Sequence, residues 1–255
     1  MTVIQSFLLG LLQGIAEFLP ISSSGHLKIA QALFGLEEVP LLFDVILHLA
    51  TLLAVMIFFR KKIIELLCFK DKKYIVDVIA ATFVTGVLGI VVKKLIDDDR
   101  LSIKFTCAGL IVTAVILFVS SLVEKKREPV EKKTPSLVQS LFVGLCQGIG
   151  TLPGISRSGS TIAGGLFCGL DREVAGEFSF IVSIPAILGA FLLEAKDLGE
   201  VTSTVGIVPL VVGFMTAFVS GYFALSVLMK LIKKGRLEWF AFYLVPVGII
   251  GLFMF

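Results

Sequence analysis

The side chains best suited to chemistry lie in two short stretches that are rich in Pro, Gly and Ser. The first stretch carries Glu17, Ser23 and His26, and the second carries Arg157. A carboxylate and an imidazole can move protons, and a hydroxyl can attack an electrophile. A guanidinium binds oxyanions through a planar fork of donors. These four residue types together indicate chemistry on a phosphate group.

The composition of the chain indicates where this chemistry takes place. The chain has 255 residues, of which 56% are hydrophobic and 17% are charged, against about 25% charged residues in an ordinary soluble domain. The net charge is only +3. These values exclude a cytosolic globular enzyme, a disordered protein and a nucleic-acid binder. They predict a polytopic membrane protein that is embedded in the lipid bilayer. Ionisable groups inside it are functional candidates, because each costs roughly 2.5–3.5 kcal/mol to insert.

Six apolar segments are long enough to cross the membrane, since a spanning helix needs about 20 mostly apolar residues. They lie roughly at 43–59, 74–92, 105–123, 174–193, 205–229 and 237–255. Two more apolar regions, 3–36 and 137–170, are interrupted by clusters of Pro, Gly and Ser. We therefore predict an all-α polytopic membrane protein with six transmembrane helices and two re-entrant helix-loop-helix hairpins.

The chain is an internal duplication. When the sequence is shifted by 134 residues, 6–15 lies over 140–149 and 21–25 lies over 155–159. If each broken region returns to the side from which it entered, each half crosses the membrane three times. The halves then have opposite orientations, as in an inverted-topology repeat. The predicted parts are a first repeat at 1–123, a charged linker at 124–135 and a second repeat at 136–255, with one re-entrant hairpin in each repeat.

The distribution of basic residues predicts the orientation. The segments 60–73, 124–133 and 230–238 hold fifteen Lys and Arg residues, whereas 93–104 and 194–204 hold five. Short loops rich in Lys and Arg stay on the cytoplasmic side. We therefore expect a cytoplasmic linker and both termini outside. The tips of the two hairpins should then meet near the middle of the membrane.

The two breaks predict a binding site for an anion. Irregular backbone inside hydrocarbon is tolerated only where it is buried in protein or lines a wet cavity. In both breaks a Pro ends one half-helix and Ser residues can cap the next. Free N–H groups at a helix start, together with the helix dipole, attract anions, and two such sites facing each other suit a diphosphate. The predicted phosphate-binding residues are Ser22, Ser24, Gly25, Ser156, Ser158 and Thr161.

The differences between the two copies indicate where the chemistry lies. The aligned pairs that differ in polarity are Glu17 and Thr151, Ser23 and Arg157, and His26 and Ser160. Gln, Gly and Ser residues shared by both copies look like scaffold, so we interpret the diverging groups as functional. The structural alternatives are a Glu17–His26 pair that holds its loop, Arg157 as a counter-ion, and Ser residues that only cap helices.

Two further features have both a functional and a structural interpretation. Asp44 and His48 lie four residues apart in the first full span, where they either border the site or form a pair that neutralises itself. The Gly-xxx-Gly patterns that begin at Gly10, Gly144 and Gly165 favour close packing of helices over a role in function.

The two breaks resemble the signature motifs of the undecaprenyl-diphosphatase family, also called bacitracin-resistance proteins. The first motif, (E/Q)GxxEFLPxSSxGH, matches 13–26, and the second, PGxSRSxxT, matches 153–161. Both motifs are long, and they stand in the right order, each in its own half. The resemblance covers essentially the whole chain, because the length and the number of spans also fit.

This resemblance implies a membrane phosphatase that removes the terminal phosphate of a polyprenyl diphosphate, which regenerates the lipid carrier for cell-wall synthesis. By motif position the catalytic residues would be Glu17, Ser23, His26 and Arg157, in a site that opens to the outer face of the plasma membrane. Glu17 would orient His26 or hold a Mg²⁺ or Ca²⁺ ion, because such hard cations prefer carboxylate and phosphate oxygens. Gln13, the second expected ligand, is a departure, since some members carry Glu there.

A different class of protein also fits part of the pattern. Inverted repeats with broken helices are the usual architecture of secondary transporters, so a transporter or flippase of a lipid phosphate or another anion is the alternative. A purely scaffolding membrane protein is a weaker one. The asymmetric set of Glu17, His26 and Arg157 favours the phosphatase, because a transporter needs no acid–base pair. Two questions stay open from the sequence: whether Ser23 or a water attacks, and whether the protein is a homodimer.

Overall fold

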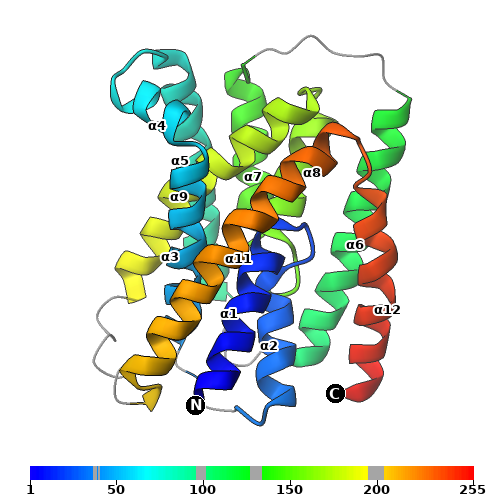
Figure 1. Cartoon of the computed structure of the whole chain (residues 1–255). Coiled ribbons are helices and arrows are strands. Elements are labelled where there is room, and N and C mark those ends of the chain that lie inside the picture. The colour runs from blue at the N-terminus through cyan, green and yellow to red at the C-terminus, as the bar shows by residue number, and fades with distance from the viewer. Residues whose placement is uncertain (37–38, 40, 96–101, 127–133, 195–203) are drawn as a thin grey trace.

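The structure, a computed structural model, describes residues 1–36, 39, 41–95, 102–126, 134–194 and 204–255, and every regular element within these residues is a helix. Figure 1 shows the arrangement of these helices. In chain order they are α1 (Val3–Phe18), α2 (Ser23–Leu33), α3 (Leu41–Phe58), α4 (Arg60–Leu67), α5 (Lys72–Leu95), α6 (Ile103–Lys125), α7 (Leu137–Ile149), α8 (Arg157–Phe167), α9 (Arg172–Glu194), α11 (Ile207–Lys233) and α12 (Glu238–Met254).

The long helices confirm a polytopic membrane protein. Five helices, α3, α5, α6, α9 and α11, are long and apolar enough to cross a membrane, and they coincide with five of the predicted spans. The sixth predicted span, 237–255, corresponds to α12, which is apolar but has 17 residues. The segment 60–73, which joins two spans as predicted, contains the short helix α4. The sequence did not predict this helix, because its eight residues are too few for a periodic pattern.

Two of the helical regions are broken in the middle, as predicted. The chain turns between α1 and α2, and again between α7 and α8, and the two pairs lie in opposite halves of the molecule (Figure 1). Ser residues cap the second helix of each pair. The Ser22 Oγ accepts a hydrogen bond from the Gly25 N–H at 3.4 Å, and the Ser156 Oγ accepts one from the Gly159 N–H at 3.0 Å. Ser22 also has a φ of 68°, a left-handed conformation that strains a residue with a Cβ.

Glycines bring the broken pairs close to helices of the other repeat, which confirms the packing role predicted for two of the patterns. α1 packs on α11, and α7 packs on α5. A Cβ on Gly14 would lie 2.5 Å from the Ala217 carbonyl oxygen of α11. A Cβ on Gly148 would lie 2.6 Å from the Leu88 Cβ of α5. Because these distances leave no room for a side chain, each break is held at a fixed depth.

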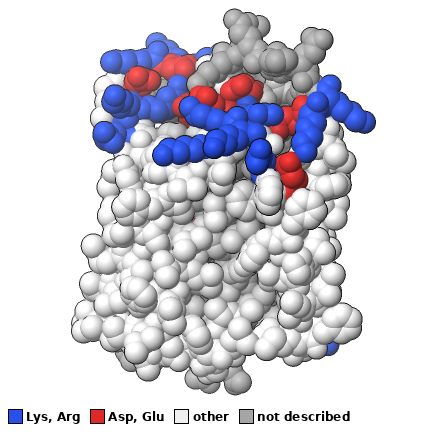
Figure 2. Space-filling model, turned by 45° about the vertical axis from the view of Figure 1, so that its right-hand side comes forward, with Lys and Arg blue, Asp and Glu red and all other residues white. Residues whose placement is uncertain are grey.

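Charged residues gather at one end of the molecule, as Figure 2 shows for one face. Ion pairs at this end join α6, α9, α11 and α12. The pairs are Arg172 with Glu124, Lys125 with Glu238 and Lys233 with Glu173. Below this end the surface in the same view is almost free of charge, which is what lipid contact requires. The predicted linker lies mostly outside the described residues, and the limits of the two repeats stay a prediction.

Candidate active site

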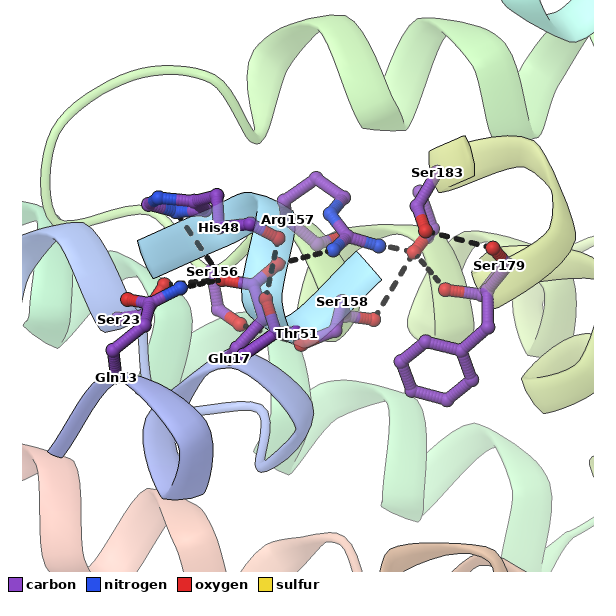
Figure 3. A network of polar contacts seen from close by, with 12 residues as sticks. Gln13, Glu17, Ser23, His48, Thr51, Ser156, Arg157, Ser158, Ser179 and Ser183 are labelled. Carbon is purple, nitrogen blue, oxygen red and sulfur yellow. Dashed lines mark hydrogen bonds and ion pairs between the residues drawn. The ribbon is translucent and has the colours of Figure 1, made fainter. Parts of the chain in front are cut away.

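The carboxylate of Glu17 is the centre of the buried polar network (Figure 3). Glu17 lies in the last turn of α1 and is only 7% exposed. Its Oε2 accepts hydrogen bonds from the Ser23 Oγ at 2.6 Å and from the Gln13 Nε2 at 3.1 Å. The His48 Nε2 lies 3.3 Å from the same oxygen. The Oε1 forms an ion pair with the Arg157 Nη2.

Four helices deliver these groups to one point. Gln13 and Glu17 lie one turn apart on α1, and the short turn after α1 returns Ser23 to Glu17 as the first residue of α2. Arg157 is likewise the first residue of α8, directly after its capping serine. His48 comes from the middle of α3. The tips of the two breaks therefore meet, with the acid on one tip and the guanidinium on the other.

One hydrogen-bond donor of Arg157 has no partner among the residues that the structure describes. One of its terminal nitrogens, Nη2, is paired with Glu17, whereas the other, Nη1, is buried and has no hydrogen-bond partner. A buried donor without a partner costs free energy, so such groups in native proteins call for an explanation. The Ser160 Oγ and the Gln13 Oε1, which is an acceptor, are also buried without a hydrogen-bond partner. An oxyanion held between the tips would satisfy the Arg157 donor.

Three of the predicted phosphate-binding hydroxyls, those of Ser22, Ser156 and Thr161, bond to backbone groups. The Ser22 and Ser156 hydroxyls cap their helices, and the Ser156 Oγ lies 3.3 Å from the Ser158 Oγ. The Thr161 hydroxyl donates to the Arg157 carbonyl oxygen at 2.9 Å. Ser24 is exposed. The hydroxyls therefore shape the tips, and their part in binding phosphate stays a prediction.

His26 lies beside the site but does not contact Glu17. Its Nδ1 is 2.9 Å from the Ser22 carbonyl oxygen, and its Nε2 is 2.9 Å from the Tyr243 hydroxyl of α12. Because a carbonyl only accepts, Nδ1 carries the proton, and Nε2 accepts from Tyr243. Within the described residues no hydrogen bond or ion pair joins His26 to Glu17. The structure therefore does not form the Glu17–His26 pair that the sequence suggested as an alternative.

The histidine next to Glu17 is His48, whose role the sequence left open. The alternative of a side-chain pair with Asp44 is not formed among the described residues. Instead the His48 Nδ1 contacts the backbone carbonyl of Asp44 at 2.7 Å, and the Asp44 carboxylate accepts from the Gln31 Nε2 at 2.8 Å. The sequence signal that pointed to His48 is that it is an ionisable side chain within an apolar span.

A resident cation does not fit the groups around Glu17. The side chains that contact its carboxylate, from Gln13, Ser23, His48 and Arg157, all act as donors, and Arg157 is a permanent cation. Mg²⁺ and Ca²⁺ need several oxygen ligands. Within the described part of the chain no group of three or more His, Cys, Asp or Glu residues is arranged to hold a metal ion. The expected site at Glu17 and Gln13 therefore gains no support from this geometry.

The fold and the site together define a polytopic helical membrane protein with a buried ionic centre between two helix breaks. The chain belongs to the family of the bacitracin resistance protein BacA, whose family model matches residues 6–250. This match confirms the resemblance carried by the two motifs.

Three similar proteins are named undecaprenyl-diphosphatase. The protein of Treponema denticola is 46% identical, over 98% of this chain and 96% of its own length. The protein of Carboxydothermus hydrogenoformans is 40% identical, also over 98% and 96%. The protein of Methanosphaera stadtmanae is 39% identical, over 99% and 98%. The similarity therefore extends over essentially the whole of each protein.

Proposed function

We propose that this protein is an integral membrane phosphatase that hydrolyses undecaprenyl diphosphate to the monophosphate and inorganic phosphate. The observation that carries the proposal is the Ser23 hydroxyl bonded to the Glu17 carboxylate, next to an Arg157 donor without a partner. Relatives that match over their whole length are named for this activity. The reaction returns the lipid carrier to cell-wall synthesis, in line with a family named for bacitracin resistance.

The nucleophile is the Ser23 Oγ, or a water in its place, and Glu17 is the base. As the Oγ–P bond forms at the terminal phosphorus, the hydroxyl proton passes to the Glu17 Oε2. The bond from that phosphorus to the bridging oxygen breaks, and its electron pair leaves with the prenyl monophosphate. In the serine route a water then gives its hydroxyl to phosphorus and its proton to Ser23, and the proton on Glu17 leaves with the products.

The remaining groups bind and orient the diphosphate. The Arg157 Nη1 donates to an oxygen of the terminal phosphate, because charge stabilisation and positioning supply most of the rate in phosphoryl transfer. The first N–H groups of α2 and α8 would bind the same charge, apart from those of Gly25 and Gly159, which donate to the capping serines. His26 handles a proton at its Nε2, the nitrogen that here accepts from Tyr243.

The finer topology is part of this proposal. α12 completes six spans, and α1–α2 and α7–α8 are re-entrant hairpins of an inverted repeat in the plasma membrane, with the site open to the outer face. The opposed placement of the two pairs and the charged end seen in Figure 2 support it (Figures 1 and 2). A homodimer is not needed for the chemistry, because Glu17, Ser23 and Arg157 come from one chain. A divalent cation, if the reaction uses one, would bind with the diphosphate oxygens rather than at Glu17.

Release of phosphate from undecaprenyl diphosphate by the purified protein in detergent tests the proposal. We expect turnover in the wild type and a loss of at least about a hundredfold in Glu17→Gln, the usual scale for a general base. Ser226→Ala, a half-buried change in α11 that removes a hydroxyl bonded to the Tyr222 carbonyl of the same helix, is the control. A phosphorylated Ser23 would establish the serine route, and full turnover in Ser23→Ala would establish attack by water. A protein that moves lipid phosphate but releases none would be a transporter, a reading that the names of the relatives do not favour.

A further inference from the structure

We propose that His48 is a positioning residue of this site, which shares a proton with Glu17 and holds its carboxylate toward Ser23. The inference rests on the proposed function, because it assigns His48 a part in that reaction. Neither motif of the family resemblance contains this residue, since they cover 13–26 and 153–161.

The geometry places His48 between a backbone acceptor and a carboxylate. Its Nδ1 lies 2.7 Å from the Asp44 carbonyl oxygen, and its Nε2 lies 3.3 Å from the Glu17 Oε2. The first contact is within one helix, α3, so it fixes the ring relative to the helix. The second contact reaches across to α1. The ring thereby sets the distance of the Glu17 carboxylate from α3.

Counting hydrogen-bond donors points to a proton between His48 and Glu17. The Asp44 carbonyl only accepts, so Nδ1 carries a proton. A neutral imidazole would then have a lone pair on Nε2, pointed at an oxygen that itself only accepts. That arrangement is repulsive, whereas an imidazolium on His48 beside an ionised Glu17 is attractive. The pair therefore holds one proton more than a neutral imidazole and a carboxylate.

The charged groups that face the ring support this assignment. Glu17 of α1 and Asp44 of α3 itself are acidic, and Arg157 of α8 pairs with the other oxygen of Glu17. The Asp44 carboxylate is bonded to Gln31 and does not reach the ring nitrogens in any hydrogen bond among the described residues. Glu17 is thus flanked by two cations. They keep it ionised although it is buried, and an ionised carboxylate is what the Ser23 hydroxyl needs as a base.

Nitrogen NMR of the protein with ¹⁵N-labelled histidine tests the proton directly. The chain has only two histidines, so the His48→Gln variant assigns both sets of signals. At neutral pH we expect both ring nitrogens of His48 to be protonated, and only the Nδ1 of His26. Glu17→Gln should return His48 to a single protonated nitrogen. A neutral His48 in the wild type would overturn the inference whether or not the protein releases phosphate.

Steady-state kinetics test the positioning role. His48→Gln keeps an N–H donor at the reach of Nε2, and His48→Leu removes it. We expect kcat in the Leu variant to fall about 10- to 100-fold, part of the usual contribution of a general base, with KM within about threefold. The Gln variant should recover most of this loss. Thr51→Val, which removes a hydroxyl bonded to the His48 carbonyl on the same helix, is the matched control.

Three results of these kinetics would speak against the proposal. Full kcat in His48→Leu, or equal losses in the Leu and Gln variants, would remove His48 from the reaction. The same loss in Thr51→Val would mean that only the packing of α3 was disturbed. If the wild type itself releases no phosphate, the proposed function fails, and the NMR experiment still decides the shared proton.

Discussion

The carboxylate of Glu17 is buried, and each side chain that contacts it can donate a hydrogen bond to it. Removing one partner of a buried ion pair leaves an unpaired charge, which typically costs about 3–5 kcal/mol. A truncation of Arg157 would therefore lower stability as well as activity, and the two effects would be hard to separate. Substitutions that keep the charge of a partner and change only its geometry give the clearer test of function.

Arg157→Lys is such a change. The ammonium keeps the pair with Glu17 but offers no second fixed donor in place of the Nη1 without a partner. We expect the kcat of phosphate release to fall about 100- to 1,000-fold, the usual effect of losing a donor aimed at developing charge. Arg172→Lys, in the Arg172–Glu124 pair at the charged end, should lose little activity. Near-normal turnover in Arg157→Lys would remove Arg157 from the catalytic set.

Gln13→Glu tests the role of the amide next to Glu17. The Gln13 Nε2 donates to Glu17, and a carboxylate there would place two like charges in one buried site. We expect phosphate release with a chelator present to fall at least about tenfold, and added Mg²⁺ to restore it, because a cation offsets the repulsion. Gln5→Glu, the same change at a half-exposed position of α1 whose side-chain oxygen accepts from the Thr2 N–H, is the control. An unchanged response to Mg²⁺ would contradict this account.

The sequence predicted most of the site, but only the part that the two breaks contain. Glu17, Ser23 and Arg157 could be predicted because they differ in polarity from the residues aligned with them in the other repeat. The contact of His48 with Glu17 joins α3 to α1 and depends on how these helices pack, which no local pattern records. For the same reason the sequence placed His26 next to Glu17, whereas α12 provides Tyr243 as its partner.

At the scale of the helices, the breaks depend on small residues as much as on the capping serines. α1 lies so close to α11 that backbone of one faces backbone of the other at Gly14 and Gly221. The starts of α2 and α8 could be predicted, because Pro and Ser act on their immediate neighbours. α4 could not, because a helix of eight residues with four charged ones has too short a pattern to separate it from a loop.

Gly14→Ala should destabilise the protein. The added Cβ would meet the Ala217 carbonyl oxygen at 2.5 Å and the Gly221 nitrogen at 2.7 Å, and backbone atoms cannot move away without shifting a helix. Such overpacking typically costs about 1–3 kcal/mol. Gly86→Ala in α5 has open space and should gain up to about 1 kcal/mol from helix propensity. Thermal unfolding in detergent measures both changes, and a lower midpoint for Gly86→Ala would contradict the argument.

At the scale of the whole molecule, the duplication has produced one site from two unlike halves. The first half provides the acid, the hydroxyl and both histidines, and the second half provides the guanidinium. The orientation was predicted from the counts of Lys and Arg and stays a prediction, although charged residues do gather at one end in Figure 2. The sequence predicted that the two tips meet. It did not predict their position among the helices, because that position follows from the packing of each broken pair on the other repeat.

Cys68 offers a native probe of the orientation. It is exposed and lies at the end of α4, in the basic segment predicted to be cytoplasmic, whereas Cys107 is buried. With Cys146 and Cys168 replaced by Ala, a membrane-impermeant thiol reagent should label inverted vesicles and leave intact cells unlabelled. Thr2→Cys in a Cys68→Ser background should show the opposite pattern. Labelling of Cys68 on intact cells would reverse the orientation.

The mutual packing of the two repeats also bears on biogenesis. α1 emerges from the ribosome first, but its partner α11 is among the last helices to be synthesised. α5 likewise is synthesised before α7, the helix on which it packs. Until the second half enters the bilayer, Glu17 in the first half lacks its ion pair with Arg157, and the glycine face of α1 has no partner helix. Because α11 lies near the end of the chain, the packing of α1 on α11 can form only when synthesis is nearly complete.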